Sequence, residues 1–171
     1  MKLSKTLFVI LLFVIPFSAS HSKQPDRAIL EMFEGTWDTT ITNRANGQSI
    51  KTVGKRKWSK AGTVLHFEEM DLSTNKEQHF LITYDPNAKV FRGTFINHVV
   101  VANYEGKWDN KTTTMHWTGT DSFGSKHVAF DRFLADGKVE WSMVITSAEG
   151  KVVLELDAKS NRRDKADKEK K

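Results

Sequence analysis

The residues best suited to chemistry in this sequence are histidines and carboxylates that lie within runs of alternating apolar residues. His66-Phe67-Glu68 matches the His-x-Glu pair of zinc-dependent deaminases, whose chemistry also requires a Pro-Cys-x-x-Cys segment. The chain has no cysteine, which excludes that reaction, cysteine-ligated metals, thiol nucleophiles and disulfides. His-Glu-x-x-His, Gly-x-Ser-x-Gly and the phosphate-binding glycine patterns are also absent. No catalytic residue is assigned, and an enzyme is the lowest ranked of the functions considered.

Four histidines lie in strand-like runs, where alternation determines which face each occupies. His66, His79, His116 and His127 fall on the face opposite the large apolar residues beside them. If those apolar residues form the interior, the imidazoles point outward. We therefore expect no interior metal site and no cofactor.

Charged residues that continue an interior phase are candidate ligand anchors. Glu69 and Asp71 follow Phe67 at a spacing of two, and they form either a cation or ligand site or a charged rim facing water. Arg132 follows Phe130 in the same way. It could clamp a ligand carboxylate through two hydrogen bonds, form an internal salt bridge with Glu69, or extend outward.

These residues lie in a chain dominated by a period of two. Residues 24–33 predict one short helix, with Pro25 in its first turn. Ten strand-like runs follow, separated by Asx-Gly, Asx-Pro and similar turn residues. The expected fold is all-β, an antiparallel up-and-down barrel of about ten strands, because closure removes exposed sheet edges. The expected strands are 35–43, 49–58, 63–72, 76–84, 89–96, 98–106, 111–119, 125–134, 138–147 and 151–158.

The predicted interior is rich in aromatic residues and methionine. Such residues usually form core, but a ten-stranded barrel is wider than an eight-stranded one that side chains just fill. The interior is therefore either a filled core or a cavity for a ligand. The residues predicted to line the cavity are Trp37, Phe67, Glu69, Phe80, Tyr84, Phe91, Trp117, Phe130, Arg132, Trp141 and Met143.

The first 20 residues are typical of a cleavable secretory signal peptide. Lys2 and Lys5 precede the apolar run 6–17, and small residues follow at 18–20. An apolar run of about twelve residues is shorter than the ~20 that a bilayer span needs. A retained membrane anchor is the alternative. We expect a secreted or periplasmic protein, cleaved after Ser20 or Ser22, with no stable membrane span after cleavage.

The formal net charge of +5 belongs to the two ends of the chain. Positions 23–158 are nearly neutral, and the basic excess lies in the leader and in residues 159–171. That balance argues against nucleic-acid binding. The predicted domains are a leader at 1–20, a barrel at 24–158 and a charged, disordered tail at 159–171.

Gly35-Thr36-Trp37, which follows the short helix, resembles the Gly-x-Trp signature of lipocalins and related calycin-type barrels. Tyr84-Asp85-Pro86, followed by Phe91, is similar to lipocalin-like domains of exported bacterial proteins. The resemblance implies a barrel whose closed end is plugged by Trp37 and capped by the helix. It also implies that an arginine near the last strand, Arg162 or Arg163, packs on Trp37 unless residues beyond Ser160 form a solvated tail. It implies no particular activity. Nitrobindin-like barrels hold haem on an interior histidine, which the outward histidine phase argues against here.

These observations favour an exported barrel that binds a small, apolar or amphiphilic ligand of unknown specificity. Burial of the ligand against aromatic walls would supply the affinity, and Arg132 or Glu69 would orient it. The first alternative is a non-catalytic accessory or interaction protein with a filled barrel. The second is an enzyme that uses Glu69 at the barrel mouth. Nothing in the sequence indicates an oligomeric state.

Overall fold

The computed structural model describes residues 25–163. The predicted leader and residues 164–171 of the predicted tail lie outside the described residues. One helix, α1 (Pro25–Glu31), precedes ten strands, and a short 3-10 turn, η1 (Ala135–Gly137), joins the eighth strand to the ninth. The strands are β1 (Gly35–Asn43), β2 (Ser49–Trp58), β3 (Leu65–Asp71), β4 (Glu77–Asp85), β5 (Val90–Ile96), β6 (Val101–Asp109), β7 (Thr114–Asp121), β8 (Lys126–Phe133), β9 (Lys138–Thr146) and β10 (Val152–Arg162).

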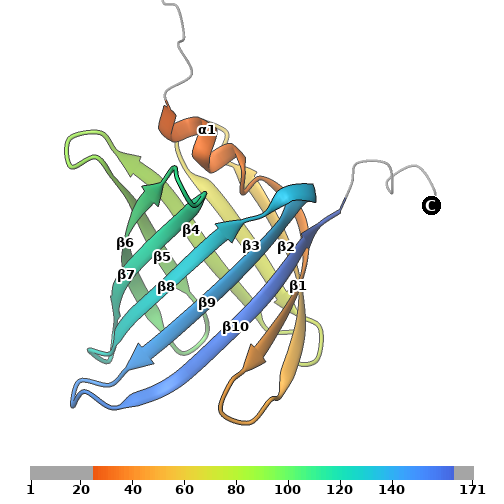
Figure 1. Cartoon of the computed structure of the whole chain (residues 1–171), viewed down its shortest axis with the longest axis vertical. Coiled ribbons are helices and arrows are strands. Elements are labelled where there is room, and N and C mark those ends of the chain that lie inside the picture. Colours follow the sequence, from red (N-terminus) through yellow and green to blue (C-terminus); the bar gives the residue numbers. More distant parts are fainter. Residues whose placement is uncertain (1–24, 164–171) are drawn as a thin grey trace, which may run out of the picture.

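The ten strands form a closed antiparallel barrel in which each strand pairs with its neighbours in sequence (Figure 1). β1 and β10 close it, with Trp37 opposite Arg162 at one end of the ladder and Asn43 opposite Leu156 at the other. Short turns make this possible: the turn between β8 and β9 has Asp136 and Gly137 at φ values of 62° and 66°, which Asx-Gly pairs adopt readily. The predicted fold class, an all-β up-and-down barrel of about ten strands with a short N-terminal helix, is confirmed.

The helix α1 lies across one end of the barrel (Figure 1). Apolar side chains fill the barrel at that end. We call Leu30, Phe33, Trp37, Leu65 and Phe133 the closed-end cluster; none is more than 9% exposed. Phe33 packs edge-on against Phe133 with ring centroids 4.6 Å apart. The indole Nε1 of Trp37 donates a hydrogen bond to the Phe33 carbonyl over 2.8 Å. Trp37 thus plugs the closed end, as the Gly-x-Trp resemblance implies.

The last strand extends beyond the boundary predicted from charge. β10 continues to Arg162, and Ser160 is buried. The Arg162 guanidinium lies 4.7 Å from the centroid of the Trp37 ring and donates to the Met32 carbonyl. Placing residues 159–162 in a disordered tail was therefore wrong. Lys159 and Asn161 are exposed, whereas Ser160 is buried opposite Thr39 and Arg162 lies opposite Trp37. Residues 159–161 pair with both β1 and β9.

Alternation assigned the interior face of most strands correctly, with one exception. The face of β6, which the sequence left undecided, is set by Ala102, Tyr104 and Gly106, which point inward. On β8 the predicted face is reversed, as described below. No helix within residues 25–163 is long and apolar enough to cross a membrane.

Candidate functional site

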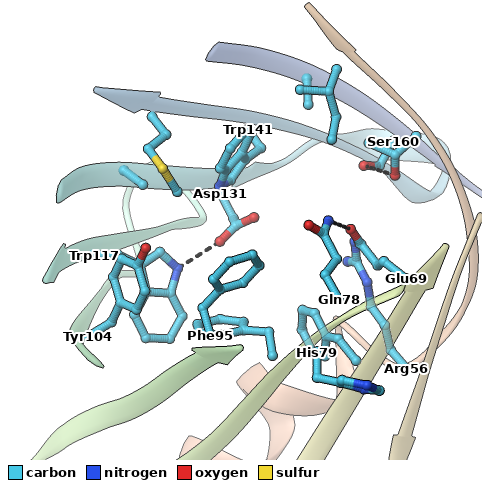
Figure 2. Close-up of a pocket in the computed structure, with 17 residues that line it drawn as sticks. Arg56, Glu69, Gln78, His79, Phe95, Tyr104, Trp117, Asp131, Trp141 and Ser160 are labelled. Atoms are coloured by element: carbon cyan, nitrogen blue, oxygen red, sulfur yellow. Dashed lines mark hydrogen bonds and ion pairs between the residues drawn. The ribbon is translucent and has the colours of Figure 1, made fainter. Parts of the chain in front are cut away.

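Beyond the closed-end cluster, the barrel interior holds a cavity of about 130 Å³ that is partly open to solvent (Figure 2). All ten strands contribute to its lining. The walls are mainly aromatic and aliphatic, and the polar groups come from a few residues. The lining residues are Thr39, Ile41, Arg56, Phe67, Glu69, Gln78, His79, Phe80, Phe95, Tyr104, Trp117, Ala129, Asp131, Trp141, Met143, Ala158 and Ser160.

One wall is built from aromatic rings that lie directly on glycines. A Cβ atom added to Gly106 would overlap the Trp117 ring, and one added to Gly93 would come within 2.5 Å of Phe80. Phe80 and Trp117 then meet at a steep angle with centroids 5.4 Å apart, the edge-to-face arrangement that aromatic pairs favour. The glycines on β5 and β6 therefore leave the space that the rings occupy beside the cavity.

A buried ion pair forms a second part of the lining. Arg56, only 7% exposed, donates through Nη2 to Oε1 of Glu69 over 3.3 Å, and Gln78 Nε2 donates to Glu69 Oε2 over 3.1 Å. The Arg56 guanidinium also lies over the Trp37 and Phe67 rings at 4.7 and 4.6 Å. Its Nε and Nη1 atoms are buried without a hydrogen-bond partner. The partner of Glu69 is therefore Arg56, which rules out the alternative in which Arg132 forms an internal salt bridge with Glu69.

Asp131 places a second carboxylate in the interior. Its Oδ2 accepts a 2.7 Å hydrogen bond from Nε1 of Trp117, and its other oxygen points into the cavity (Figure 2). Burial raises the pKa of Asp131 to about 6, and the negative charge of Glu69 acts in the same direction. The Trp117 hydrogen bond and the positive charge of Arg56 oppose that shift of the pKa without cancelling it.

A buried network links the cavity wall to the turn between β7 and β8. The Tyr104 hydroxyl lies 2.5 Å from Nδ1 of His127, and Nε2 of His127 lies 3.1 Å from Oδ2 of Asp121. Burial, and then the charge of Asp121, raise the pKa of Tyr104. Burial also acts to raise the pKa of Asp121, but hydrogen bonds from Ser125, His127 and the Phe123 backbone hold it below its usual value. Both ring nitrogens of His127 are engaged, so neither is open to a metal.

The predicted lining residues separate into three groups. Six contact the cavity, three lie nearer the closed end, and two point away from the interior. The six are Phe67, Glu69, Phe80, Trp117, Trp141 and Met143. Trp37 belongs to the closed-end cluster, and Tyr84 and Phe91 pack on each other with centroids 5.1 Å apart without lining the cavity. Placing these three in the cavity lining was wrong, because their layer of the barrel is already filled.

Phe130 and Arg132 lie on the outer face, contrary to prediction. On β8 the inward residues are His127, Ala129, Asp131 and Phe133, whereas Val128 is 60% exposed. The Arg132 guanidinium lies 5.5 Å from the Phe130 ring centroid. The inward positions of Asp131 and His127 are stabilised by hydrogen bonds. Trp117 on β7 bonds to Asp131, and Tyr104 on β6 bonds to His127. Among the four histidines, only His127 was assigned to the wrong face; His66 and His79 bond to each other, and His116 is exposed.

The cavity residues that the sequence did not reveal are mostly polar: Arg56, Gln78, Tyr104 and Asp131. One signal for Asp131 was available in the sequence. The face of β8 opposite Asp131 begins with Lys126 and ends with Arg132, and charged residues at both ends of a face are typical of a strand surface that faces solvent. A polar residue on an interior phase has no comparable signal, because its hydrogen-bond partners lie on other strands.

Phe130 lines a second depression, of about 340 Å³, on the outer face. Its other lining residues are mostly polar or charged, and Glu140, Asp157 and Lys159 are among them. This depression is more open to solvent than the interior cavity, so it would bury less of a ligand. The interior cavity is therefore the better candidate site. Within the described part of the chain, no group of three or more histidine or acidic side chains is placed to hold a metal ion.

Residues 22–146 match the family described as "Protein of unknown function (DUF1579)". The chain belongs to this family. The fold of this family member is a lipocalin-like barrel, as the Gly-x-Trp resemblance implied. No curated protein matches the chain.

Two solved structures share the fold. The crystal structure of Rv2717c from M. tuberculosis matches with a TM-score of 0.58 and 8% identity, covering 82% of this chain and 99% of that one. The S-type phycobiliprotein lyase CPES from Guillardia theta matches with a TM-score of 0.54 and 12% identity, covering 83% and 94% respectively. At these identities the likeness is one of fold alone.

Proposed function

We propose that this protein binds one small, partly apolar molecule inside the barrel. The observation that carries the proposal is the cavity of about 130 Å³, which has aromatic walls and a few polar groups facing its interior. An engineered cavity of ~150 Å³ in another protein accepts benzene. The cavity described here therefore suits a ligand of about one ring, with room for a substituent toward the solvent-accessible side.

The binding energy would come mainly from burial of the ring. An aromatic ring buries about 150–250 Å², which at ~25 cal/mol per Å² corresponds to roughly 4–6 kcal/mol before the costs of association. The costs of association reduce this gain, so a single-ring probe should bind weakly, with a Kd on the order of 1 mM or above. The S-type phycobiliprotein lyase shares the fold at 12% identity, and its name does not identify a ligand for this chain.

The test compares ring-sized probes on three forms of the protein. Ethylbenzene, benzyl alcohol, benzylamine and benzoate are titrated while tryptophan fluorescence is followed, because Trp117 and Trp141 line the cavity. Ala129→Leu should weaken every probe that binds wild type, since its added carbons enter the cavity. Val128→Leu is the matched control, because Val128 is the adjacent residue on β8 and faces outward.

Saturable binding that Ala129→Leu reduces by ten-fold or more, and Val128→Leu leaves unchanged, would support the proposal. Absence of binding by all four probes would overturn it and favour the accessory protein with a filled barrel. Binding that both substitutions affect equally would also count against an interior site.

We also propose that the barrel is exported by means of residues 1–20. The basic, apolar and small-residue segments of this stretch support the proposal. The full chain and a form lacking residues 2–20 would be expressed in a Gram-negative host, and the soluble fractions analysed by intact mass. Export predicts a mature chain that begins at His21 or Lys23 in the periplasm, for the full chain only. An uncleaved protein in the cytoplasm would contradict it.

A further inference from the structure

Among the cavity-lining residues that the structure describes, Oδ1 of Asp131 and Oε1 of Gln78 accept no hydrogen bond from the protein, and of the two only the Asp131 oxygen belongs to a carboxylate. Of the two oxygens of Asp131, Oδ2 accepts from Trp117, whereas Oδ1 faces the cavity (Figure 2). Buried carboxylates normally accept several hydrogen bonds or face a positive charge, because burial without them is costly. A ligand that donates to Oδ1 would supply what the protein leaves out.

The interior charges favour a positive donor. Among the described residues that line the cavity, two carboxylates, Glu69 and Asp131, are accompanied by one guanidinium, Arg56. Arg56 forms its ion pair with Glu69, and its positive charge only partly offsets the effect of burial on the pKa of Asp131. The walls include Trp117 and Trp141, and tryptophan rings attract cations through their faces.

Arg56 does not offer an equivalent site for an anion. Its two unpartnered atoms, Nε and Nη1, have no accessible surface, because the guanidinium is packed against the Trp37 and Phe67 rings. A molecule in the cavity would have to displace those rings to reach them. The accessible polar surface of the cavity is therefore acceptor-rich at Asp131.

We propose that the cavity binds a small aromatic cation whose protonated nitrogen donates a hydrogen bond to Oδ1 of Asp131. This inference rests on the proposed binding function and specifies its ligand class. The ring would occupy the space between the aromatic walls, and the cation would complete the charge balance of the interior.

Binding should then depend on pH through Asp131. The pKa of Asp131 is raised to about 6, so most of the carboxyl is protonated at pH 5 and ionised at pH 7.5. A bound cation favours the ionised form. Cation affinity should therefore fall by about ten-fold from pH 7.5 to pH 5. The other titratable groups around the interior are Glu69, Arg56, His79, Tyr104 and the His127–Asp121 pair, so a variant is needed to assign the effect.

The experiment measures Kd for benzylamine, benzyl alcohol, ethylbenzene and benzoate at both pH values, with the full chain. Benzylamine carries the charge, benzyl alcohol is a neutral donor of equal size, and benzoate carries the opposite charge. We expect benzylamine to bind at least ten-fold more tightly than ethylbenzene at pH 7.5. Asp131→Asn should remove that preference and its pH dependence, both measured as the ratio of the benzylamine Kd to the ethylbenzene Kd of the same protein.

The outcomes separate this inference from the function on which it rests. If the neutral probes bind and benzylamine has no advantage, or if benzoate binds most tightly, the ligand class is wrong and the binding function stands. If no probe binds, both fail. If Asp131→Asn does not fold, the wild-type pH series decides: a benzylamine Kd that is unchanged between pH 5 and 7.5 overturns the inference.

Discussion

The closed end and the cavity occupy the same barrel but are built in different ways. At the closed end, Phe33, Trp37 and Leu65 are fully buried, and the Trp37 indole has its hydrogen-bond partner. Around the cavity, Asp131 has one unpartnered oxygen and a raised pKa, and the interior also encloses a charged pair. The closed end is arranged as a core that stabilises the fold. The cavity encloses polar groups at a cost in stability, and such costs are typical of functional sites.

The largest effect is expected from removal of the plug at the closed end. Trp37→Ala should lower the free energy of unfolding by about 3–5 kcal/mol, because it leaves a large cavity among rigid neighbours. Chemical denaturation followed by circular dichroism measures this loss. Trp108→Ala is the comparison within the same end of the barrel: Trp108 packs on Phe133 but is only partly buried, so its loss should cost less. Equal losses would contradict the special role of Trp37.

A substitution in the cavity, Asp131→Asn, is expected to raise the free energy of unfolding at neutral pH rather than lower it. The pKa of Asp131 is raised from 3.8 to about 6 in the fold, so the folded state holds its proton more tightly than the unfolded state. The contribution of Asp131 to stability therefore declines as pH rises from about 4 to about 6 and stays low above that range.

Asp131→Asn changes the free energy of unfolding by an amount that should depend on pH. This change should be more favourable at pH 7.5 than at pH 3.5 by up to about 3 kcal/mol. The measurement is urea denaturation of both proteins across this pH range. A difference between them that does not change with pH would show that the carboxyl is not perturbed in the fold.

Substitution of the glycine beneath the cavity wall should have an intermediate effect. In Gly106→Ala the new Cβ meets the Trp117 ring, so the ring must shift, at a cost of about 1–3 kcal/mol. The near-ultraviolet circular dichroism of the tryptophans and probe binding should change together. Gly150→Asn is the control, because no atom lies near a Cβ at Gly150 and Asn tolerates its positive φ. If Gly106→Ala leaves probe binding unchanged, the Trp117 ring is not part of the binding site.

The smallest effect on stability is expected from two adjacent arginines at the end of the last strand, whose side chains have different surroundings. Arg162 lies against Trp37, whereas Arg163 pairs with Asp38 where both side chains are about half exposed. Arg163→Ala should cost only about 0.2–1 kcal/mol, and less in high salt. Arg162→Ala should cost about 1–2 kcal/mol, since it loses a cation–π contact and a hydrogen bond to the Met32 carbonyl. Thermal unfolding at low and high salt distinguishes the two. Equal losses would contradict this difference.

The sequence by itself determined the architecture of this protein. The period of two, the turn residues and the absence of a long helical pattern predicted a ten-stranded antiparallel barrel. These features are local: they depend on neighbouring residues and on backbone geometry. The plugged end was implied by the resemblance of Gly35-Thr36-Trp37 to the lipocalin signature. Six predicted lining residues, among them Phe67, Trp117 and Trp141, contact the cavity because large apolar side chains mark the interior face clearly.

Only the tertiary structure decided which polar residues share the interior. Asp131 and His127 face inward because Trp117 and Tyr104, on strands β7 and β6, hydrogen-bond to them. Arg56 is buried because Glu69 and two aromatic rings surround it. Such partners are distant in sequence and meet only through the strand register. Burial of a polar group depends on its partners more than on its own hydropathy, so the chemical character of the cavity emerges only in the folded barrel.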